Sequence, residues 1–502
     1  MKFINRLLLT YYSPLLRQLD TSSHRYEASQ HETFRQLMQH MDSTRFAQEH
    51  QLDHNSDYEQ FRKQVPVREY DDFQPYIHSI QCGEQNILWN EPVQWFAKSS
   101  GTSSGKSKFI PITPANLKHC HYRGFQLMLA HYLRQHPDSG MMYGKALTLG
   151  GSVAADSRTG DLSAILLQNS PKVAEWIRTP ERKTALIPNF EQKVEQICRE
   201  CSHKNVTSFS GVPSWNLLLL RRILDYAGKG NLLEIWPNLE LFMHGGTYFE
   251  PYREQFRKLI PSDQMHYLEN YNASEGYFAF QDDLQEQGMR LVLDNGVFYE
   301  FIPLEQLPKV LDGDLSPILP LSGIQVGQEY ALVISTNSGL WRYLIGDTVR
   351  FTSNQPHRII ITGRTQLYIN TFGEELMINN AEKALAAACQ ATGAIVSEYT
   401  VAPIFFQGSE KGRHEWLIEF ETQPQGSLEN FAEKLDQALC QQNSDYEAKR
   451  NGTMERLKIT SVPKGTFYRW MEQRGKVGGQ NKVPRLYPKR DFIEQLNQLI
   501  IN

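Results

Sequence analysis

Residues 99–108 read Ser-Ser-Gly-Thr-Ser-Ser-Gly-Lys-Ser-Lys, and no other stretch of the chain says as much about its fold and chemistry. The run combines glycines, hydroxyl side chains and two lysines. A loop of this composition brings backbone N–H groups, hydroxyls and ammonium groups to one place, and these are the partners that nucleotide phosphates need. A solvated turn is the alternative, because glycine and serine also dominate turns.

The run nearly fits the Walker phosphate-loop pattern Gly-x-x-x-x-Gly-Lys-Ser, with Ser100 in the first glycine position. A Walker loop, however, opens a helix at its lysine. Here Lys106 leads into residues 108–113, Lys-Phe-Ile-Pro-Ile-Thr, which are typical of a strand and contain a proline. A helix is expected only later, with Thr113 as its N-cap and Pro114 as its first residue. The loop is therefore predicted to join two strands, which disfavours a Walker-type ATPase or kinase.

The composition is that of an ordinary globular chain. Of its 502 residues, 40% are hydrophobic and 22% are charged, and this length suggests about two to four domains. The formal net charge is -4 and no long basic run stands out, so nucleic acid is not an expected partner. No stretch approaches the ~20 apolar residues of a membrane-spanning helix, and residues 7–9 are too short an apolar run for a signal peptide. We therefore expect a cytoplasmic protein with no membrane partner. The six cysteines are scattered along the sequence, and in this compartment we expect their thiols to be reduced.

The organisation of the chain changes about three quarters of the way along it. Residues 291–303 read as a β-hairpin around an Asn-Gly turn, and residues 330–362 are rich in strand patterns. After these, helical and strand patterns alternate in a compact α+β unit. We therefore expect an α/β fold with a strand-rich part and a boundary near Gln366, which gives domains 1–365 and 366–502.

A second motif, Tyr-Asn-Ala-Ser-Glu, occupies residues 271–275 after a predicted strand. The ring of Tyr271 offers a flat face on which adenine could stack. The carboxylate of Glu275 could hold Mg²⁺ that bridges phosphate oxygens. A surface loop with a routine aromatic residue is the alternative interpretation.

A third motif, Trp-Arg-Tyr-Leu-Ile-Gly-Asp, occupies residues 341–347. Gly346 allows the backbone to turn. Asp347 then offers two acceptor oxygens, which suit the two hydroxyls of a ribose. An aspartate in an ordinary β-turn is the alternative.

The order of these three motifs resembles that of the adenylate-forming superfamily. The chain is more closely similar to the plant-type acyl-acid amido synthetases, the auxin-responsive Gretchen Hagen family. The resemblance also rests on Phe-Ile-Pro at residues 109–111, on Gly-Glu-Gln-Asn-Ile-Leu-Trp at residues 83–89 and on Asn-Lys-Val-Pro-Arg at residues 481–485. It spans nearly the whole chain.

The resemblance implies a large N-terminal adenylate-forming domain and a smaller, mobile α+β C-terminal domain. It implies an enzyme that uses ATP and Mg²⁺ to join a carboxylic acid to an amine, commonly an amino acid. The carboxylate attacks the α-phosphate and releases pyrophosphate, and the amine then attacks the acyl-adenylate and releases AMP. The oligomeric state is left open.

The resemblance also implies which residues bind the nucleotide. The loop would hold the β- and γ-phosphates, and Tyr271 would stack near adenine. Asp347 would bind the ribose, and Arg364 would contact ribose or phosphate. These predicted ATP-binding residues are Ser99, Ser100, Gly101, Thr102, Ser103, Lys106, Tyr271, Ser274, Asp347 and Arg364.

Two residues are implied to be catalytic. Glu275 would bind Mg²⁺, and Lys482 would reach the α-phosphate when the small domain closes; an exposed lysine is the alternative for the latter. The acyl pocket would be lined by four residues from two segments, with the arginine among them anchoring a polar group of the acid or else forming a surface salt bridge. These residues are Tyr122, Arg123, Val212 and Pro213.

Two other functions remain open from the sequence. An acyl-CoA ligase shares the adenylation step but uses a thiol as the acceptor. A nucleotide-binding protein with a decayed site would not be an enzyme, although the presence of Lys106, Glu275, Asp347 and Lys482 argues against decay. The sequence does not identify the acid, the amine or the pathway.

Overall fold

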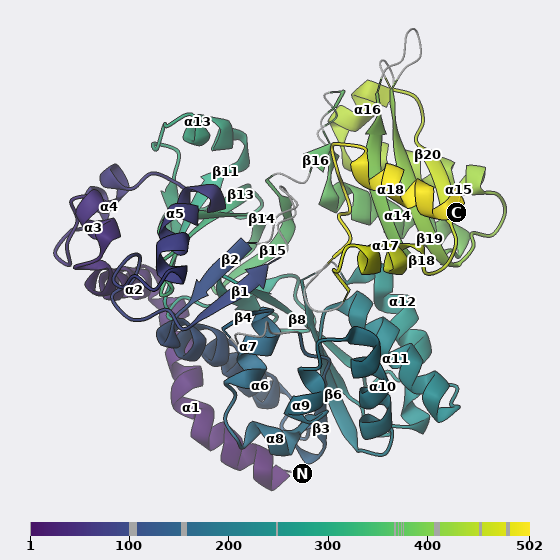
Figure 1. The fold of residues 1–502 in the computed structure, drawn as a ribbon, viewed down its shortest axis with the longest axis horizontal. Coiled ribbons are helices and arrows are strands. Elements are labelled where there is room, and N and C mark those ends of the chain that lie inside the picture. Colours follow the sequence, from purple (N-terminus) through teal and green to yellow (C-terminus); the bar gives the residue numbers. More distant parts are fainter. Residues whose placement is uncertain are drawn as a thin grey trace.

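The computed structural model shows a mixed α/β protein in which a large N-terminal part carries a smaller C-terminal domain (Figure 1). This arrangement confirms the predicted fold class. The structure describes residues 2–99, 108–151, 158–246, 249–365, 368–369, 371–372, 374, 376–405, 412–450, 454–477 and 482–501.

A twelve-stranded mixed sheet forms the centre of the N-terminal part. Its order is β12-β11-β13-β14-β15-β10-β9-β8-β7-β6-β3-β5. The strands from β8 to β5 run parallel to their neighbours, whereas the pairs from β12 to β8 are antiparallel. The strands are β3 (Lys145–Thr148), β5 (Arg178–Thr179), β6 (Val206–Gly211), β7 (Leu241–Gly245), β8 (His266–Ala273), β9 (Gly276–Phe280), β10 (Met289–Leu291), β11 (Val297–Pro303), β12 (Leu319–Pro320), β13 (Glu329–Thr336), β14 (Tyr343–Asn354) and β15 (His357–Arg364).

Three helices pack against the parallel strands. They are α10 (Phe190–Cys201), α11 (Pro213–Ala227) and α12 (Glu250–Leu259), and Figure 1 shows them side by side. Proline at the start of α11 and the left-handed Gly228 after its end fix the limits of that helix. The rings of Phe209 and Phe242, from β6 and β7, stack at a centroid distance of 4.3 Å in the core under these helices. Burial of these apolar faces is what holds the helices to the sheet.

The N-terminal part begins with five helices, which end at Gln81. It contains α1 (Lys2–His24), α2 (Tyr26–Met41), α3 (Arg45–Glu49), α4 (Tyr58–Gln64) and α5 (Tyr70–Gln81). A small sheet follows, formed by β1 (Trp95–Ser99), β2 (Lys108–Ile112) and β4 (Thr159–Gly160).

The loop between β1 and β2 joins two antiparallel strands, as predicted. Ser99 pairs with Lys108 at the end of this ladder that the loop connects. Thr113 caps the next helical segment by accepting a hydrogen bond of 3.0 Å from the backbone N–H of Asn116. That segment begins as a π-helix, η1 (Asn116–Tyr122), and continues as α6 (Arg123–Gln135). A strand after the loop contradicts a Walker architecture.

The predicted hairpin at residues 291–303 is wrong. Strands β10 and β11 are present, but β10 pairs with β9 and β15, while β11 pairs with β12 and β13. The side chains of the turn contact other elements instead. Asp294 forms an ion pair with Arg123, and Asn295 donates a hydrogen bond to the backbone carbonyl of Tyr277. The Asn-Gly turn therefore links two strands that are separated by others in the same sheet.

The C-terminal domain is a three-stranded sheet covered on both faces. Its strands are β18 (Ile395–Ile404), β19 (Arg413–Thr422) and β20 (Lys458–Val462). Trp416 and Ile418 of β19 pack toward α14 (Ile378–Thr392) and α15 (Leu428–Gln442), whereas Leu417 packs toward α17 (Thr466–Gln473) and α18 (Asp491–Ile501). This alternation is the two-residue period of a strand with two buried faces.

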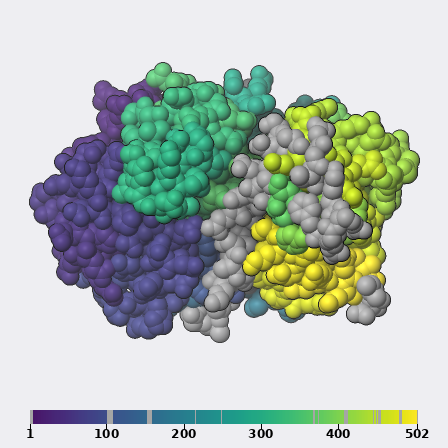
Figure 2. Space-filling model, turned by 90° about the horizontal axis from the view of Figure 1, so that it is seen from above, coloured from purple at the N-terminus to yellow at the C-terminus, as the bar shows by residue number. Residues whose placement is uncertain are grey.

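In a space-filling view, the C-terminal domain forms a second lobe beside the N-terminal part (Figure 2). The boundary predicted near Gln366 lies outside the described residues and stays a prediction.

The remaining short elements are η2 (Met141–Tyr143), α7 (Leu162–Gln168), α8 (Ala174–Ile177), α9 (Arg182–Ala185), η3 (Leu232–Glu234), η4 (Leu304–Gln306), α13 (Leu307–Leu311), η5 (Leu321–Gly323), β16 (Tyr368–Ile369), β17 (Leu376–Met377) and α16 (Ser444–Arg450). Among the described residues, the helices are all too short or too polar to span a bilayer.

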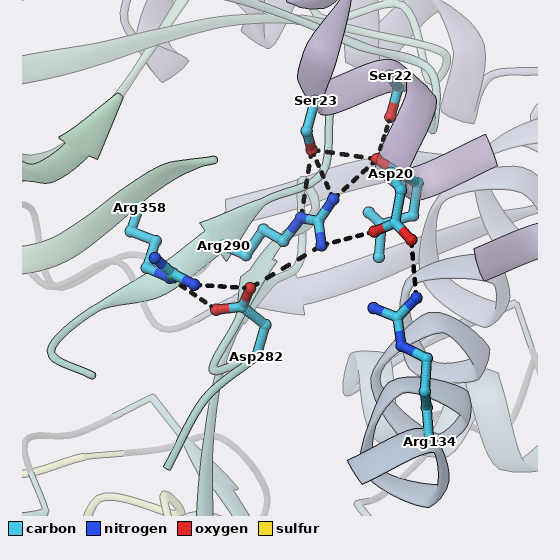
Figure 3. A network of polar contacts seen from close by, with 8 residues as sticks. Asp20, Ser22, Ser23, Arg134, Asp282, Arg290 and Arg358 are labelled. Carbon is cyan, nitrogen blue, oxygen red and sulfur yellow. Dashed lines mark hydrogen bonds and ion pairs between the residues drawn. The ribbon is translucent and has the colours of Figure 1, made fainter. Parts of the chain in front are cut away.

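Arg290 of β10 ties α1 to the large sheet (Figure 3). Its guanidinium lies 3.0 Å from Asp20 and 3.9 Å from Asp282, and it donates to the hydroxyl of Ser23. The side chain is only 7% exposed. Arg358 forms a second ion pair with Asp282, at 2.8 Å, so the network joins α1, β10 and β15.

Replacing Arg290 with alanine should lower the free energy of unfolding by about 3 kcal/mol, because it breaks a buried ion-pair network. Urea unfolding followed by tryptophan fluorescence measures this loss. Arg257→Ala is the matched control: its ion pair with Glu254 is exposed and is expected to contribute below about 0.5 kcal/mol. Equal stabilities of the two variants would contradict the structural role of Arg290.

Candidate active site

Two of the predicted motifs meet at Asp347 of β14. The hydroxyl of Tyr271, on β8, donates a hydrogen bond of 2.5 Å to Oδ2 of Asp347. Nε of Arg364, at the end of β15, lies 3.2 Å from Oδ1. Asp347 and Arg364 are direct partners across the antiparallel ladder of β14 and β15. The carboxylate is therefore oriented through both of its oxygens.

Gly346 makes room for this arrangement. Its φ of +88° is left-handed, and a Cβ built there would lie 3.2 Å from Nη2 of Arg364. That same Nη2 donates to the carbonyl of Ile345 at 3.1 Å. A side chain at this position would be strained by its backbone and would crowd the guanidinium. The glycine of the third motif thus allows the arginine to lie beside the aspartate.

Tyr271 is buried, and its ring packs edge-to-face on Phe278 at a centroid distance of 4.8 Å. Burial, followed by the charge of Asp347, raises the pKa of the Tyr271 hydroxyl well above its ordinary value. The tyrosine therefore stays a neutral donor to Asp347. Its predicted stacking on adenine stays a prediction.

Glu275 is the centre of a second group of polar side chains. It is buried, at 6% exposed, and accepts a hydrogen bond of 3.4 Å from the hydroxyl of Tyr343. Nζ of Lys108 donates to the same hydroxyl at 3.3 Å. Burial raises the pKa of Glu275, and the nearby Lys108 opposes this shift. Ser274, the preceding residue, is also buried.

Lys108 is a residue that the sequence reasoning missed. Its ammonium group lies over the rings of Tyr70 and Tyr343, at 5.5 and 5.9 Å from their centroids. Burial lowers its pKa, and Glu275 opposes this shift. It is the second lysine of the quoted run, and its position at the first residue of a strand is the signal that could have identified it.

The phosphate-type loop lies between Ser99 and Lys108, and Lys108 is linked to Glu275 through the hydroxyl of Tyr343. Ser99 closes β1 and pairs with Lys108, which reaches Tyr343. The other predicted residues of the loop lie outside the described residues, and their predicted contacts with phosphate stay predictions. They are Ser100, Gly101, Thr102, Ser103 and Lys106.

Lys482 reaches this site from the C-terminal domain. Its Nζ donates a hydrogen bond to the backbone carbonyl of Gly246, which follows β7. Burial lowers the pKa of Lys482 to about 8; the charge of Arg364 also lowers it, and that of Asp347 opposes the shift. The lysine is therefore within electrostatic reach of Asp347, near the start of β14, and of Arg364, at the end of β15.

The predicted acyl-pocket residues lie in two places. Val212 and Pro213 begin α11, and Cγ2 of Val212 lies 3.6 Å from the point where a Cβ on Gly246 would be, beside Lys482. Tyr122 donates to the carbonyl of Leu166 at 2.7 Å. Arg123 forms an ion pair of 2.7 Å with Asp294, so its guanidinium already has a carboxylate partner.

The site has few groups that could ligate a metal. Within the ranges that the structure describes, no cluster of three or more histidine, cysteine, aspartate or glutamate side chains could hold an ion. Glu275 fits Mg²⁺ nonetheless, because this ion is usually bound by one or two carboxylates together with substrate phosphates and water.

Comparison with known families covers most of the chain. The model of the GH3 family N-terminal domain matches residues 15–154 and 151–265, that of the central domain matches residues 290–364, and that of the C-terminal domain matches residues 379–491. The chain belongs to the GH3 family. The family predicted from the sequence motifs is thereby confirmed.

Curated GH3 relatives match over nearly their full length. Indole-3-acetic acid-amido synthetase GH3.8 of Oryza sativa subsp. indica is 25% identical over 97% of this chain and 92% of the relative. Jasmonoyl–L-amino acid synthetase JAR4 of Nicotiana attenuata is 24% identical over 91% of this chain and 90% of the relative.

Solved structures agree on the fold of this GH3 protein. The acyl acid amido synthetase AtGH3.15 in complex with 2,4-DB superimposes with a TM-score of 0.79 at 17% identity and covers 98% of this chain and 96% of its own. A 2-hydroxyisobutyryl-CoA ligase in its postadenylation state superimposes with a TM-score of 0.57 at 13% identity and covers 99% of this chain and 92% of its own. The fold alone is therefore shared by enzymes named for amine and for thiol acceptors.

Proposed function

We propose that this GH3 protein is an ATP-dependent ligase that adenylates a carboxylic acid and transfers the acyl group to an amino acid. The proximity of Asp347 to both Glu275 and Lys482, from three distant parts of the sequence, carries this proposal. The two curated relatives described above are named as an indole-3-acetic acid-amido synthetase and a jasmonoyl–L-amino acid synthetase, which supports an amine acceptor.

The nucleotide would lie beside the end of β8, the start of β14 and the end of β15. A carboxylate has about four acceptor sites, so Asp347 can accept from ribose hydroxyls while it keeps Tyr271 and Arg364. The loop between β1 and β2 would then direct its N–H groups and hydroxyls to the β- and γ-phosphates. Because Lys108 follows that loop and is linked to Glu275 through Tyr343, the phosphates would come close to both.

Mg²⁺ would be held by Glu275 and the phosphate oxygens of ATP. When bound, the ion neutralises phosphate charge and so makes pyrophosphate a better leaving group. The chain's own contribution is to keep the Glu275 carboxylate fixed through the hydroxyl of Tyr343, and to bring the charge of Lys108 nearby.

Two bond exchanges follow from this placement. A carboxylate oxygen of the acid attacks the α-phosphorus, and the bond to pyrophosphate breaks. The nitrogen of the amino acid then attacks the acyl carbon, loses a proton and displaces AMP. The ammonium group of Lys482 would stabilise the negative charge at the α-phosphate in the first exchange, so positioning and electrostatics supply the rate.

The C-terminal domain would move between these two exchanges. Its own hydrophobic cores, separate from those of the N-terminal part, support this interpretation. We also place the reaction in a reducing compartment such as the cytoplasm, because all six cysteines, each in the described part of the chain, are free.

A screen for pyrophosphate release tests the proposal. The protein is incubated with ATP, Mg²⁺ and a panel of carboxylic acids that starts with indole-3-acetate and jasmonate. Acids that release pyrophosphate are then offered separately with amino acids and with coenzyme A, and the products are identified by mass spectrometry. We expect an acyl–amino acid amide. A thioester as the sole product would instead identify an acyl-CoA ligase, and a lack of pyrophosphate release with every acid would contradict adenylation.

A further inference from the structure

Arg485 lies three residues after Lys482, in a segment fixed to the edge of β18. The backbone carbonyl of Arg485 accepts a hydrogen bond of 2.8 Å from the N–H of Val401, and the carbonyl of Pro484 accepts one of 2.6 Å from the hydroxyl of Thr400. The path of the chain that carries the lysine is therefore set by the sheet of the C-terminal domain.

The guanidinium of Arg485 links the two domains. Nη1 lies 2.5 Å from Oε1 of Glu398 on β18, and the guanidinium lies over the ring of Tyr399 at 4.6 Å from its centroid. Nη2 donates to the hydroxyl of Tyr252, which belongs to α12 of the N-terminal part. Arg485 is 11% and Glu398 15% exposed, so this ion pair is partly shielded from water.

Helix α12 carries other contacts to the same strand. Nε2 of Gln255 donates to the carbonyl of Val396 at 2.9 Å. Oε1 of Gln255 accepts from Arg221 at 2.8 Å, and Arg221 pairs with Glu421 of β19 at 2.9 Å. These contacts form only when the C-terminal domain rests on α11 and α12.

A cavity of about 390 Å³ lies between the domains beside this link. Tyr252, Glu398, Lys482 and Arg485 are among the residues that line it. The surfaces of the two domains are thus separated by this cavity next to the lysine. The bond between Arg485 and Tyr252 is consequently one of the contacts on which the position of the lysine segment depends.

The charges around Lys482 agree with this geometry. After burial and the charge of Arg364, Arg485 is a further cation that lowers the pKa of the lysine, and Glu382 of α14 is an anion that opposes the shift. Glu398 offsets the charge of Arg485 by pairing with it. Without that pair, two cations three residues apart would repel each other near the site.

We propose that Arg485 is a positioning residue, which clamps the segment of Lys482 to α12 and so presents the lysine at Gly246 when the C-terminal domain rests on α11 and α12. The inference rests on the proposed function, in which Lys482 serves adenylation. Arg485 itself contacts no reacting atom. Its loss should slow formation of the acyl-adenylate and leave the attack of the amine unaffected.

Tyr252→Phe tests the clamp with the least disturbance, since it removes one hydroxyl. We expect acid-dependent pyrophosphate exchange to fall about tenfold, the worth of one hydrogen bond to a charged group. Amide formation from a supplied acyl-adenylate and an amino acid should stay within about twofold of the wild-type rate. Arg485→Lys, which keeps the charge but cannot bridge Glu398 and Tyr252, should show the same separation of the two half-reactions.

Tyr446→Phe is the matched control. Tyr446 is buried in the C-terminal domain, and its hydroxyl donates to Asp436 at 2.9 Å without crossing to the other domain. This variant should keep both half-reactions. Unchanged exchange in Tyr252→Phe, or an equal loss of both half-reactions in Tyr252→Phe and Arg485→Lys, would overturn the inference.

Amine labelling gives a readout that needs no substrate. Acetic anhydride is added to the protein, and acetylation of Lys482 is quantified by mass spectrometry relative to the exposed Lys434. We expect Lys482 to be acetylated several-fold faster in Tyr252→Phe than in the wild type and in Tyr446→Phe. Equal labelling would overturn the clamp. A wild type that exchanges no pyrophosphate with any acid would instead contradict the proposed function.

Discussion

Replacing Asp347 with alanine is expected to slow acid-dependent pyrophosphate exchange about 100-fold or more, the loss that a small misplacement of reacting groups can cause. Asp347 would bind ribose, and it also holds two other groups: the hydroxyl of Tyr271 at 2.5 Å and Nε of Arg364 at 3.2 Å. Alanine removes the acceptor of both. The KM for ATP should rise and kcat should fall together, and a titration of ATP in the exchange assay measures the two effects.

Two further variants separate the site from the stability of the protein. Asp347→Asn keeps the shape but not the charge that pairs with Arg364, so its loss should be smaller than that of alanine. Asp436→Ala breaks a partly buried ion pair with Arg450 inside the C-terminal domain, at 2.9 Å. It should lower stability and leave the KM for ATP unchanged. Exchange within tenfold of wild type in Asp347→Ala would remove this residue from the nucleotide site.

Part of this arrangement could be predicted because its signals are local. The proline and β-branched residues after the quoted run indicate a strand, and the structure has β2 there. Gly346 followed by Asp347 indicates a turn that presents a carboxylate, and the structure places that carboxylate between Tyr271 and Arg364. A residue type with one dominant conformational or chemical use is informative without any knowledge of the fold.

Other features depend on partners that are distant in the sequence. The sequence predicts either an acyl pocket or a salt bridge for Arg123, and the partner in the structure is Asp294, 171 residues away. The same aspartate lies in the turn whose sequence predicts a hairpin. The Asn-Gly signal describes the turn alone, while the choice of strand partners is made by the sheet, which places β13, β14 and β15 between β10 and β11. The sequence does not reveal the roles of Lys108 and Arg485 for the same reason. Each side chain donates a hydrogen bond to a tyrosine that is distant in the sequence.

Replacing Lys482 with alanine is expected to slow adenylation about 10²–10³-fold, the usual cost of removing one donor that stabilises charge in a transition state. ATP binding should persist, because the residues that orient Asp347 belong to the N-terminal part. Amide formation from a supplied acyl-adenylate should also persist. Rapid-quench measurement of the two half-reactions tests this separation, and an unchanged adenylation rate would exclude the lysine from the mechanism.

The same lysine gives this prediction a dependence on pH. Lys482 carries its positive charge below its pKa, which burial and then Arg364 lower to about 8. Adenylation should therefore be fastest below pH 8 and should fall as the pH rises through this value and the ammonium group loses its proton. Because kcat/KM reports the free enzyme, the fall should appear in kcat/KM for ATP. Lys482→Arg stays charged throughout this range and should abolish the fall, so an identical pH profile in that variant would assign the titration to another group.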